Sequence, residues 1–251
     1  MNANKLKLLK RLGVKYVAPV GARSVSAPAE GPLPASASAV EVPAAITAPV
    51  VHGIVPGIVK AGPQADAMTA LYQSIHECQK CPLGKTRLHF VFGSGDPAAE
   101  IVFVGEAPGA DEDEQGLPFV GRAGQLLTKI IESTKTWKRE EVFICNVLKC
   151  RPPGNRTPQP EEVEICRPYL EAQLKIIHPK LIVAMGASAA HALLKTKEAV
   201  GKLRGNWHDL DGVPLRVTYH PAALLRDPSY KRGVWDDMKI ITSRYQELKT
   251  Q

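Results

Sequence analysis

The stretch 101-IVFVGEAPG-109 decides the fold, because it joins a short apolar run to a loop that contains glycine and proline. Its first four residues are apolar without alternation, which is typical of a strand buried on both faces of a sheet. Runs of the same kind recur at residues 142–145, 181–184 and 215–218. We therefore expect four buried, parallel strands.

Helical candidates separate these runs. Apolar residues recur at helical spacing from Ala65 through Met68, Leu71 and Ile75, ahead of the first strand. The other candidates span residues 121–133, 160–177, 187–194 and about 228–248. Alternating strands and helices predict a three-layer α/β fold, in which helices flank a four-stranded parallel sheet and ligands bind at the carboxyl ends of the strands.

The N-terminal part of the chain differs in composition. Residues 18–62 consist mainly of Ala, Pro, Ser, Val and Gly, which cannot bury enough surface to offset the entropy of ordering. Residues 5–17 are basic and could form a short amphipathic helix, with a frayed tail as the alternative. We expect residues 1–62 to be a disordered extension and residues 63–251 to form one folded domain.

Charge and hydropathy narrow the class of protein. The 251 residues carry a formal net charge of +7, which favours polyanionic partners but does not establish them. No run reaches the roughly 18 apolar residues of a membrane span, and the basic N-terminus lacks the apolar segment of a secretory signal. A lack of acids before Glu30 leaves an organellar transit peptide open. We expect a cytoplasmic, reducing compartment, where clustered cysteines serve metal binding or catalysis.

Four of the five cysteines form two pairs along the chain, Cys78 with Cys81 and Cys150 with Cys166. Four thiolates can hold either zinc or an iron–sulfur cluster, and the spacing alone does not choose between them. Unrelated buried thiols are a third interpretation. Cys145 lies inside a predicted strand, so we expect it to be a small core residue.

Several candidate functional residues lie where the predicted strands end. Glu106 follows the first strand and His220 follows the fourth, so both are expected at the same edge of the sheet. Phe119 could stack on a planar ligand or belong to the core. The acids at 111–114 could act on a substrate or water, or form a solvated loop. The leucines at 224–225 could be an exposed wedge or the first turn of a helix.

Four motifs occur together in a fixed order. They are GEAPG at 105–109, GLPFVGRAG at 116–124, NVLKCRPP at 146–153 and HP at 220–221. Their order and sequence resemble the family 4 uracil-DNA glycosylases, the iron–sulfur branch of that superfamily, over residues 66 to 245. The resemblance implies a [4Fe–4S] cluster held by Cys78, Cys81, Cys150 and Cys166.

The resemblance also implies an enzyme that extrudes uracil from single- or double-stranded DNA and hydrolyses its N-glycosidic bond in base-excision repair. Phe119 would stack on uracil, Asn146 would bind its Watson–Crick edge, and His220 would donate a hydrogen bond to the pyrimidine oxygen. Gly105 and Ala107 would line the bound base. The residues implied in DNA contact are Pro152, Pro153, Asn155, Arg156, Leu224, Leu225 and Arg226, with one of the two leucines filling the gap in the duplex.

The group that activates the attacking water stays open. Some branches of the superfamily place an aspartate where this chain has Ala107, so Glu106 and Glu112 are both candidates. Relatives that form a covalent adduct through a histidine carry an extra basic loop after the asparagine strand. The loop at 154–158 is too short for that role, which favours hydrolysis.

Two other functions stay open at this point. A non-catalytic iron–sulfur module would use the same pocket to recognise DNA damage, and a zinc-stabilised hydrolase would use the four cysteines to bind zinc. We expect a monomer whose partner is uracil-containing DNA. The extension at 1–62 could contact DNA or a replication or repair protein, or serve no binding role.

Overall fold

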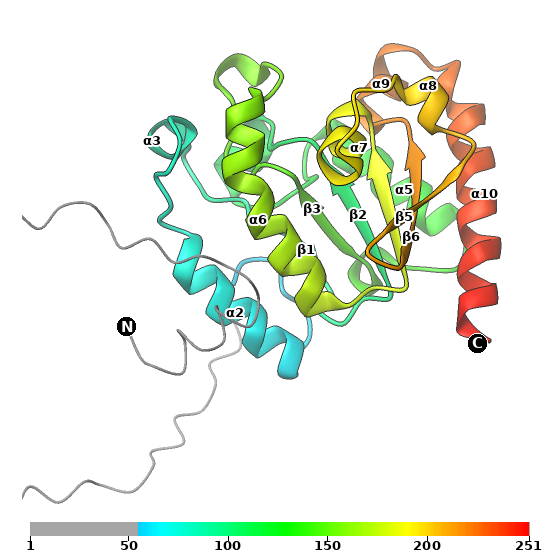
Figure 1. Ribbon diagram of the computed structural model, residues 1–251, viewed down its shortest axis with the longest axis horizontal. Helices are drawn as coiled ribbons and strands as arrows, with labels where there is room; N and C mark the ends of the chain where they lie inside the picture. Colours follow the sequence, from blue (N-terminus) through cyan, green and yellow to red (C-terminus); the bar gives the residue numbers. More distant parts are fainter. Residues whose placement is uncertain (1–54, 251) are drawn as a thin grey trace, which may run out of the picture.

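A mixed six-stranded sheet forms the centre of the computed structural model, which describes residues 55–250 (Figure 1). The strands lie in the order β1-β3-β2-β4-β6-β5. Their bounds are β1 Ser94–Gly95, β2 Ile101–Gly105, β3 Phe143–Asn146, β4 Leu181–Met185, β5 Trp207–Leu210 and β6 Val213–Thr218. The inner four strands are parallel, with Val102 opposite Phe143 and Ile182 opposite Leu215. The predicted four-stranded parallel sheet is confirmed.

The two edge strands, β1 and β5, were not predicted. Each pairs antiparallel with its neighbour, β1 with β3 and β5 with β6. Strand β1 has only two residues, and β5 alternates between exposed and half-buried side chains instead of being apolar. Asp211 and Gly212 form the turn between β5 and β6 with φ of 53° and 87°. An Asp-Gly pair is a known hairpin signal, so β5 could have been found from the sequence.

Helices cover both faces of this sheet and make the three layers (Figure 1). Their bounds are α2 Pro63–Ile75, α3 Leu83–Thr86, α4 Ala110–Gln115, α5 Arg122–Ser133, α6 Pro160–Ile177, α7 Ala187–Leu194, α8 Val200–Leu203, α9 Pro221–Arg226 and α10 Tyr230–Lys249, with 3₁₀ turns at η1 Arg139–Glu141 and η2 Pro153–Asn155. Helices α2, α6, α7 and α8 pack on the face that includes Val102 and Val104. Helices α5, α9 and α10 pack on the face that includes Ile101 and Phe103.

The residues just before α2 pack against the sheet edge, although the sequence analysis placed them in the disordered linker. Val55 is 4% exposed, Ile58 forms a bridge with Gly95, and Lys60 pairs with Asp96. Apolar and charged contacts with β1 therefore order residues 55–62. The predicted helix at 5–17 lies outside the described residues. Within residues 55–250, no helix is both long and apolar enough to cross a bilayer.

Candidate active site

A cavity of about 810 Å³ opens at the carboxyl ends of the parallel strands. Each parallel strand contributes to its wall as it ends: Glu106 follows β2, Asn146 ends β3, Met185 ends β4, and His220 lies two residues beyond β6. This is the edge at which the sequence analysis expected a ligand. The candidates Ala107, Glu112, Phe119, Pro152, Asn155, Arg156 and Arg226 also line the cavity.

Phe119 and Asn146 meet over a glycine at the end of β2. A Cβ atom on Gly105 would lie 2.4 Å from Asn146 Oδ1 and 2.5 Å from Phe119 Cζ, so only glycine permits this approach. Phe119 adopts a φ of 53°, which is unusual for an aromatic residue. Helix α5 packs below it through Gly124, whose hypothetical Cβ would lie 1.9 Å from the Phe119 carbonyl oxygen. The chain thus holds Phe119 in a strained conformation beside Asn146, as functional sites often do.

Asn146 presents an unpaired acceptor at this site. Asn146 is 2% exposed, and its Oδ1 atom has no hydrogen-bond partner among the described residues. Its backbone carbonyl accepts a hydrogen bond of 2.8 Å from Lys149 Nζ, which anchors the main chain below the amide. Buried polar atoms are nearly always paired, so this one indicates a missing donor from a ligand or water.

His220 is held in one tautomer. Its Nδ1 accepts a hydrogen bond of 3.2 Å from the backbone N–H of Ala222 and caps α9. Burial, with a smaller effect of the Arg226 charge, lowers the pKa of His220 to about 4, so the ring is neutral near pH 7. A neutral ring that accepts at Nδ1 carries its proton on Nε2. The Phe119 and His220 ring centroids lie 5.5 Å apart, so the two rings are neighbours in the cavity wall.

The two candidate glutamates have different environments. Glu112 Oε1 accepts from the backbone N–H groups of Val120 and Gly121 at 2.9 and 3.0 Å, and Oε2 accepts from that of Gly109 at 3.0 Å. Its carboxylate therefore ties the loop after β2 to the loop that carries Phe119. Glu106 instead accepts one hydrogen bond from Ser188 Oγ in the first turn of α7. Glu106 is the glutamate with free acceptor capacity at the cavity.

Some of the residues implied in DNA contact are exposed, and others pack in the core or form an ion pair within the protein. Leu225 is 42% exposed, whereas Leu224 is 1% exposed and packs in the core between α5 and α10. Leu224 therefore cannot enter a duplex, because the docking of α9 turns it inward. Arg156 forms a two-pronged ion pair with buried Glu162, at 2.9 and 2.7 Å. Pro153 is exposed in the same loop.

The four paired cysteines gather on the face covered by α2 and α6. Cys78 and Cys81 lie just beyond α2, which ends at Ile75. Cys150 and Cys166 are buried in the core cluster, and Cys78 and Cys81 pack against it. Burial raises the pKa of Cys150, with smaller contributions from the Cys81 and Cys78 thiols. Burial raises the pKa of Cys166 to about 12.

Polar groups approach the sulfur atoms of these cysteines. Arg87 Nη1 donates to Cys150 Sγ at 3.2 Å, and the Tyr169 hydroxyl lies 3.2 Å from Cys78 Sγ. Hydrogen bonds to cysteine sulfur are typical of iron–sulfur sites. Among residues 55–250, no three His, Cys, Asp or Glu side chains converge closely enough to hold a single metal ion. Cys145 is fully buried in β3, as predicted.

Lys149 connects the cysteines to the cavity. Its side chain is fully buried, and its Nζ donates to the Asn146 carbonyl at 2.8 Å and to Gln173 Oε1 at 2.6 Å. Gln173 in turn donates to the Phe92 carbonyl at 2.9 Å. Every polar side-chain atom of Lys149 and Gln173 therefore has a hydrogen-bond partner. The segment between Asn146 and Cys150 is therefore fixed at both ends.

Comparison with known proteins decides the family. The sequence model of the Uracil DNA glycosylase superfamily matches residues 92–239, more than half of the chain. A type-4 uracil-DNA glycosylase of Pyrobaculum aerophilum is 47% identical over 178 residues, which are 68% of this chain and 90% of that protein. Those of Thermotoga maritima and Saccharolobus solfataricus are 45% and 41% identical, covering 69% and 70% of this chain and 92% and 85% of theirs.

The chain belongs to the type-4 uracil-DNA glycosylases of this superfamily. The resemblance in the four motifs is thereby confirmed, and with it the expectation that the chain is a glycosylase. Sequence reasoning about this glycosylase missed Ser188 and Lys149. Ser188 lies just after β4, so the rule that strand ends carry function could have found it. A buried lysine has no sequence signal, because it looks like any basic surface residue.

Proposed function

We propose that this glycosylase flips uracil out of DNA, hydrolyses its N-glycosidic bond and leaves an abasic site as the first step of base-excision repair. The observation that carries the proposal is the unpaired Oδ1 of Asn146, buried beside Phe119 in the cavity. The Watson–Crick edge of uracil offers one N–H donor between two carbonyl acceptors. An amide that can accept through Oδ1 and donate through Nδ2 complements that edge.

His220 supports departure of the base. As the glycosidic bond breaks, negative charge collects on the pyrimidine oxygen, and a fixed donor at that position stabilises the transition state more than the ground state. The neutral ring with its proton on Nε2 supplies such a donor without first taking a proton from solvent. Phe119 would stack on the flipped ring and exclude water from one face.

Glu106 is the better candidate for handling the attacking water. The Glu112 carboxylate already accepts hydrogen bonds from three backbone N–H groups, so Glu112 would act by holding the two loops together. Glu106 lines the cavity and keeps free lone pairs beside its contact with Ser188. Ala107 next to it leaves room that a larger residue would fill. We assign Glu106 to water positioning and Glu112 to loop positioning.

The four cysteines Cys78, Cys81, Cys150 and Cys166 would hold a [4Fe–4S] cluster. Cys150 and Cys166 are buried and Cys78 and Cys81 pack against the same core cluster, so all four thiols lie on one face of the sheet. Four cysteine thiolates are the usual ligands of such a cluster. Arg87 and Tyr169 would hydrogen-bond to the bound sulfurs. When bound, the cluster would supply structural support for the segment that follows β3, without taking part in bond cleavage.

DNA would contact the rim of the cavity. Leu225 is the candidate to fill the gap left by the flipped nucleotide, and the exposed residues Pro153, Asn155 and Arg226 would contact the backbone around it. Pro152 is buried and would support this loop from below. Arg156 would act through Glu162 and hold the loop in shape. In an excision assay, Leu225→Ala should lower activity on duplex DNA by roughly tenfold and leave single-stranded DNA nearly unaffected. Equal losses on both substrates would remove Leu225 from this role.

The decisive experiment measures abasic-site formation on oligonucleotides with one uracil, single-stranded or opposite guanine, followed by alkaline cleavage. The wild type should cut both, and Glu106→Gln should lower kcat by about 100-fold with KM nearly unchanged. Asp111→Asn removes an exposed acid from the neighbouring helix and is the matched control. If the wild type, with its iron intact, released uracil from neither substrate, a non-catalytic module would replace this proposal.

A further inference from the structure

Two tyrosines line the cavity beyond the residues assigned to uracil. The Tyr219 and Tyr230 ring centroids lie 4.4 Å apart with an angle of 32° between the rings, and both residues line the cavity wall. Tyr219 directly precedes His220, and Tyr230 begins α10. Tyr230 is 37% exposed, one of the most exposed large rings of the described residues. One face of this stacked pair is therefore open to a ligand.

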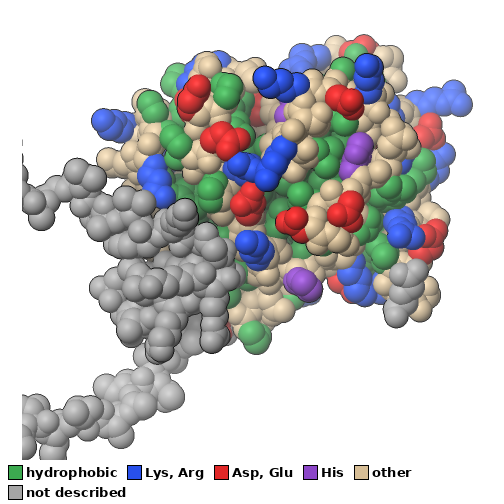
Figure 2. Space-filling model, viewed as in Figure 1, with side chains coloured by type: hydrophobic (Ala, Val, Ile, Leu, Met, Phe, Trp, Pro, Cys, Tyr) green, Lys and Arg blue, Asp and Glu red, His purple; other side chains and the backbone are tan. Residues whose placement is uncertain are grey.

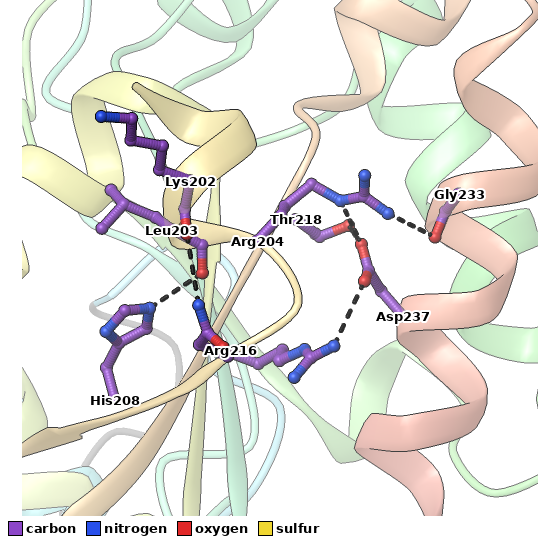
Figure 3. Close-up of polar contacts among 9 residues, drawn as sticks. Lys202, Leu203, Arg204, His208, Arg216, Thr218, Gly233 and Asp237 are labelled. Atoms are coloured by element: carbon purple, nitrogen blue, oxygen red, sulfur yellow. Dashed lines mark hydrogen bonds and ion pairs between the residues drawn. The ribbon is translucent and has the colours of Figure 1, made fainter. Parts of the chain in front are cut away.

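An ion pair between the half-buried Arg204 and the buried Asp237 holds the rear of the stack. The guanidinium carbon of Arg204 lies 4.3 Å from the Tyr219 ring centroid. Arg204 donates through Nε to Asp237 Oδ2 at 2.8 Å and through Nη2 to the Gly233 carbonyl at 2.9 Å (Figure 3). A ring cannot carry two groups this close on one face, so Tyr219 lies between Arg204 and Tyr230.

Asp237 makes this arrangement rigid. It is 3% exposed and also accepts a hydrogen bond of 2.6 Å from Thr218 Oγ1 at the end of β6 (Figure 3). Arg216 lies 3.7 Å from its other oxygen. The network joins β6 to α10 and fixes Arg204 against the Tyr219 ring. A preordered aromatic pair loses little entropy on binding, which favours affinity.

Basic residues flank the exposed ring. Arg226 lines the same cavity wall, and Lys231 and Arg232 follow Tyr230 with exposed side chains. One acid, Asp227, also lines this wall, and its carboxylate accepts a hydrogen bond from the Ser229 backbone N–H just before α10. Figure 2 shows basic and acidic side chains interspersed over the face in view. Exposed aromatic rings among positive charges are typical of surfaces that bind single-stranded nucleic acid.

We propose that Tyr230, backed by Tyr219 and Arg204, is a stacking site for the nucleobase next to the uridine in the same strand. The inference rests on the proposed function. A cavity of about 810 Å³ is far larger than one pyrimidine, and the tyrosines and the uracil residues share its wall. A neighbouring base of the same strand is the ligand that is always present there. Stacking accepts any base, so the site would raise affinity without adding sequence preference.

The test uses the full-length, iron-loaded enzyme and single-stranded oligonucleotides in which the base on the 5′ or the 3′ side of uridine is replaced by a tetrahydrofuran spacer. For the wild type, a spacer on one of the two sides should raise KM roughly tenfold with kcat nearly unchanged. Tyr230→Ala should raise KM by a similar factor on the intact strand and show no further rise with that spacer. Tyr230→Phe keeps the ring and should behave as the wild type.

The matched control is Trp235→Ala, which removes a 43% exposed ring from the same helix outside the cavity wall and should leave KM unchanged. Melting temperatures within about 2 °C of the wild type exclude a folding defect. The proposal is overturned if the Tyr230→Ala and spacer effects multiply, or if Tyr230→Ala leaves KM unchanged. If the wild type released no uracil at all, the proposed function would fail instead.

Discussion

The cysteine region and the cavity lie at the two ends of the segment from Asn146 to Cys150. They differ in whether their buried polar groups have hydrogen-bond partners. Around the cysteines, Lys149, Gln173 and Arg87 each make two or more hydrogen bonds. At the cavity, Asn146 Oδ1 has no partner and Phe119 is strained. The hydrogen bonds of the cysteine region can stabilise the fold. The unpaired oxygen and the strained backbone at the cavity lower stability, as binding sites often do.

Removing one of the four cysteines proposed to hold the cluster should have the largest effect. We expect Cys166→Ala to lose iron, to melt roughly 10 °C lower and to lose most excision activity, because cluster binding contributes directly to folding free energy. Iron content, thermal melting and uracil release measure the three results. Cys145→Ala is the control, since it removes a buried thiol from β3 and should keep its iron. A Cys166→Ala protein without iron but with full stability and activity would contradict a structural cluster.

The cavity should respond in the opposite way to a change at Asn146. Asn146→Ala should lower kcat/KM by about 1000-fold, because a site built around hydrogen bonds to the base loses its main one. Stability should stay the same or rise slightly, since the mutation removes a buried, unpaired oxygen. Steady-state kinetics and thermal melting test both parts. Asn206→Ala changes an exposed asparagine and should be neutral in both. A large drop in melting temperature would place Asn146 in the stable region instead.

The contrast between the two regions also marks what the sequence could predict. The apolar runs at 101–105 and 181–185 identify buried strands because every side chain in them is apolar or glycine. The roles of Leu224 and Leu225 could not be separated, because the docking of α9 against α5 decides which one faces the core. The unpaired oxygen of Asn146 is likewise invisible in the sequence, since it depends on how three chain segments converge.

The connection between the regions can be weakened through Lys149. Lys149→Met keeps the length of the side chain but leaves the Asn146 carbonyl and Gln173 Oε1 without their donor. Unpaired buried acceptors cost about 1–3 kcal/mol each, so unfolding free energy should fall by about 2 kcal/mol or more. We expect kcat/KM to fall about tenfold, because the main chain below the Asn146 amide loses its anchor. Denaturant unfolding and excision kinetics, with Lys175→Met at an exposed lysine of α6 as a control, separate the two effects. Unchanged kinetics would mean that the regions act independently.

The smallest effect concerns acid pH at the cavity. Burial holds the pKa of His220 near 4, below its usual 6.5, so the neutral form that donates through Nε2 persists as pH falls from 7 to 5. We therefore expect no loss of kcat/KM attributable to His220 over this range. At neutral pH, Nδ1 accepts a hydrogen bond from the Ala222 N–H. Below about pH 4, a proton on Nδ1 would point at that N–H, and the ring would lose its position. The pH profile of kcat/KM for the wild type, measured against His220→Gln, tests this. A limb with a midpoint near 6.5 that disappears in the variant would show that the ring is solvated like a free imidazole, and the fixed-donor role of His220 would no longer hold.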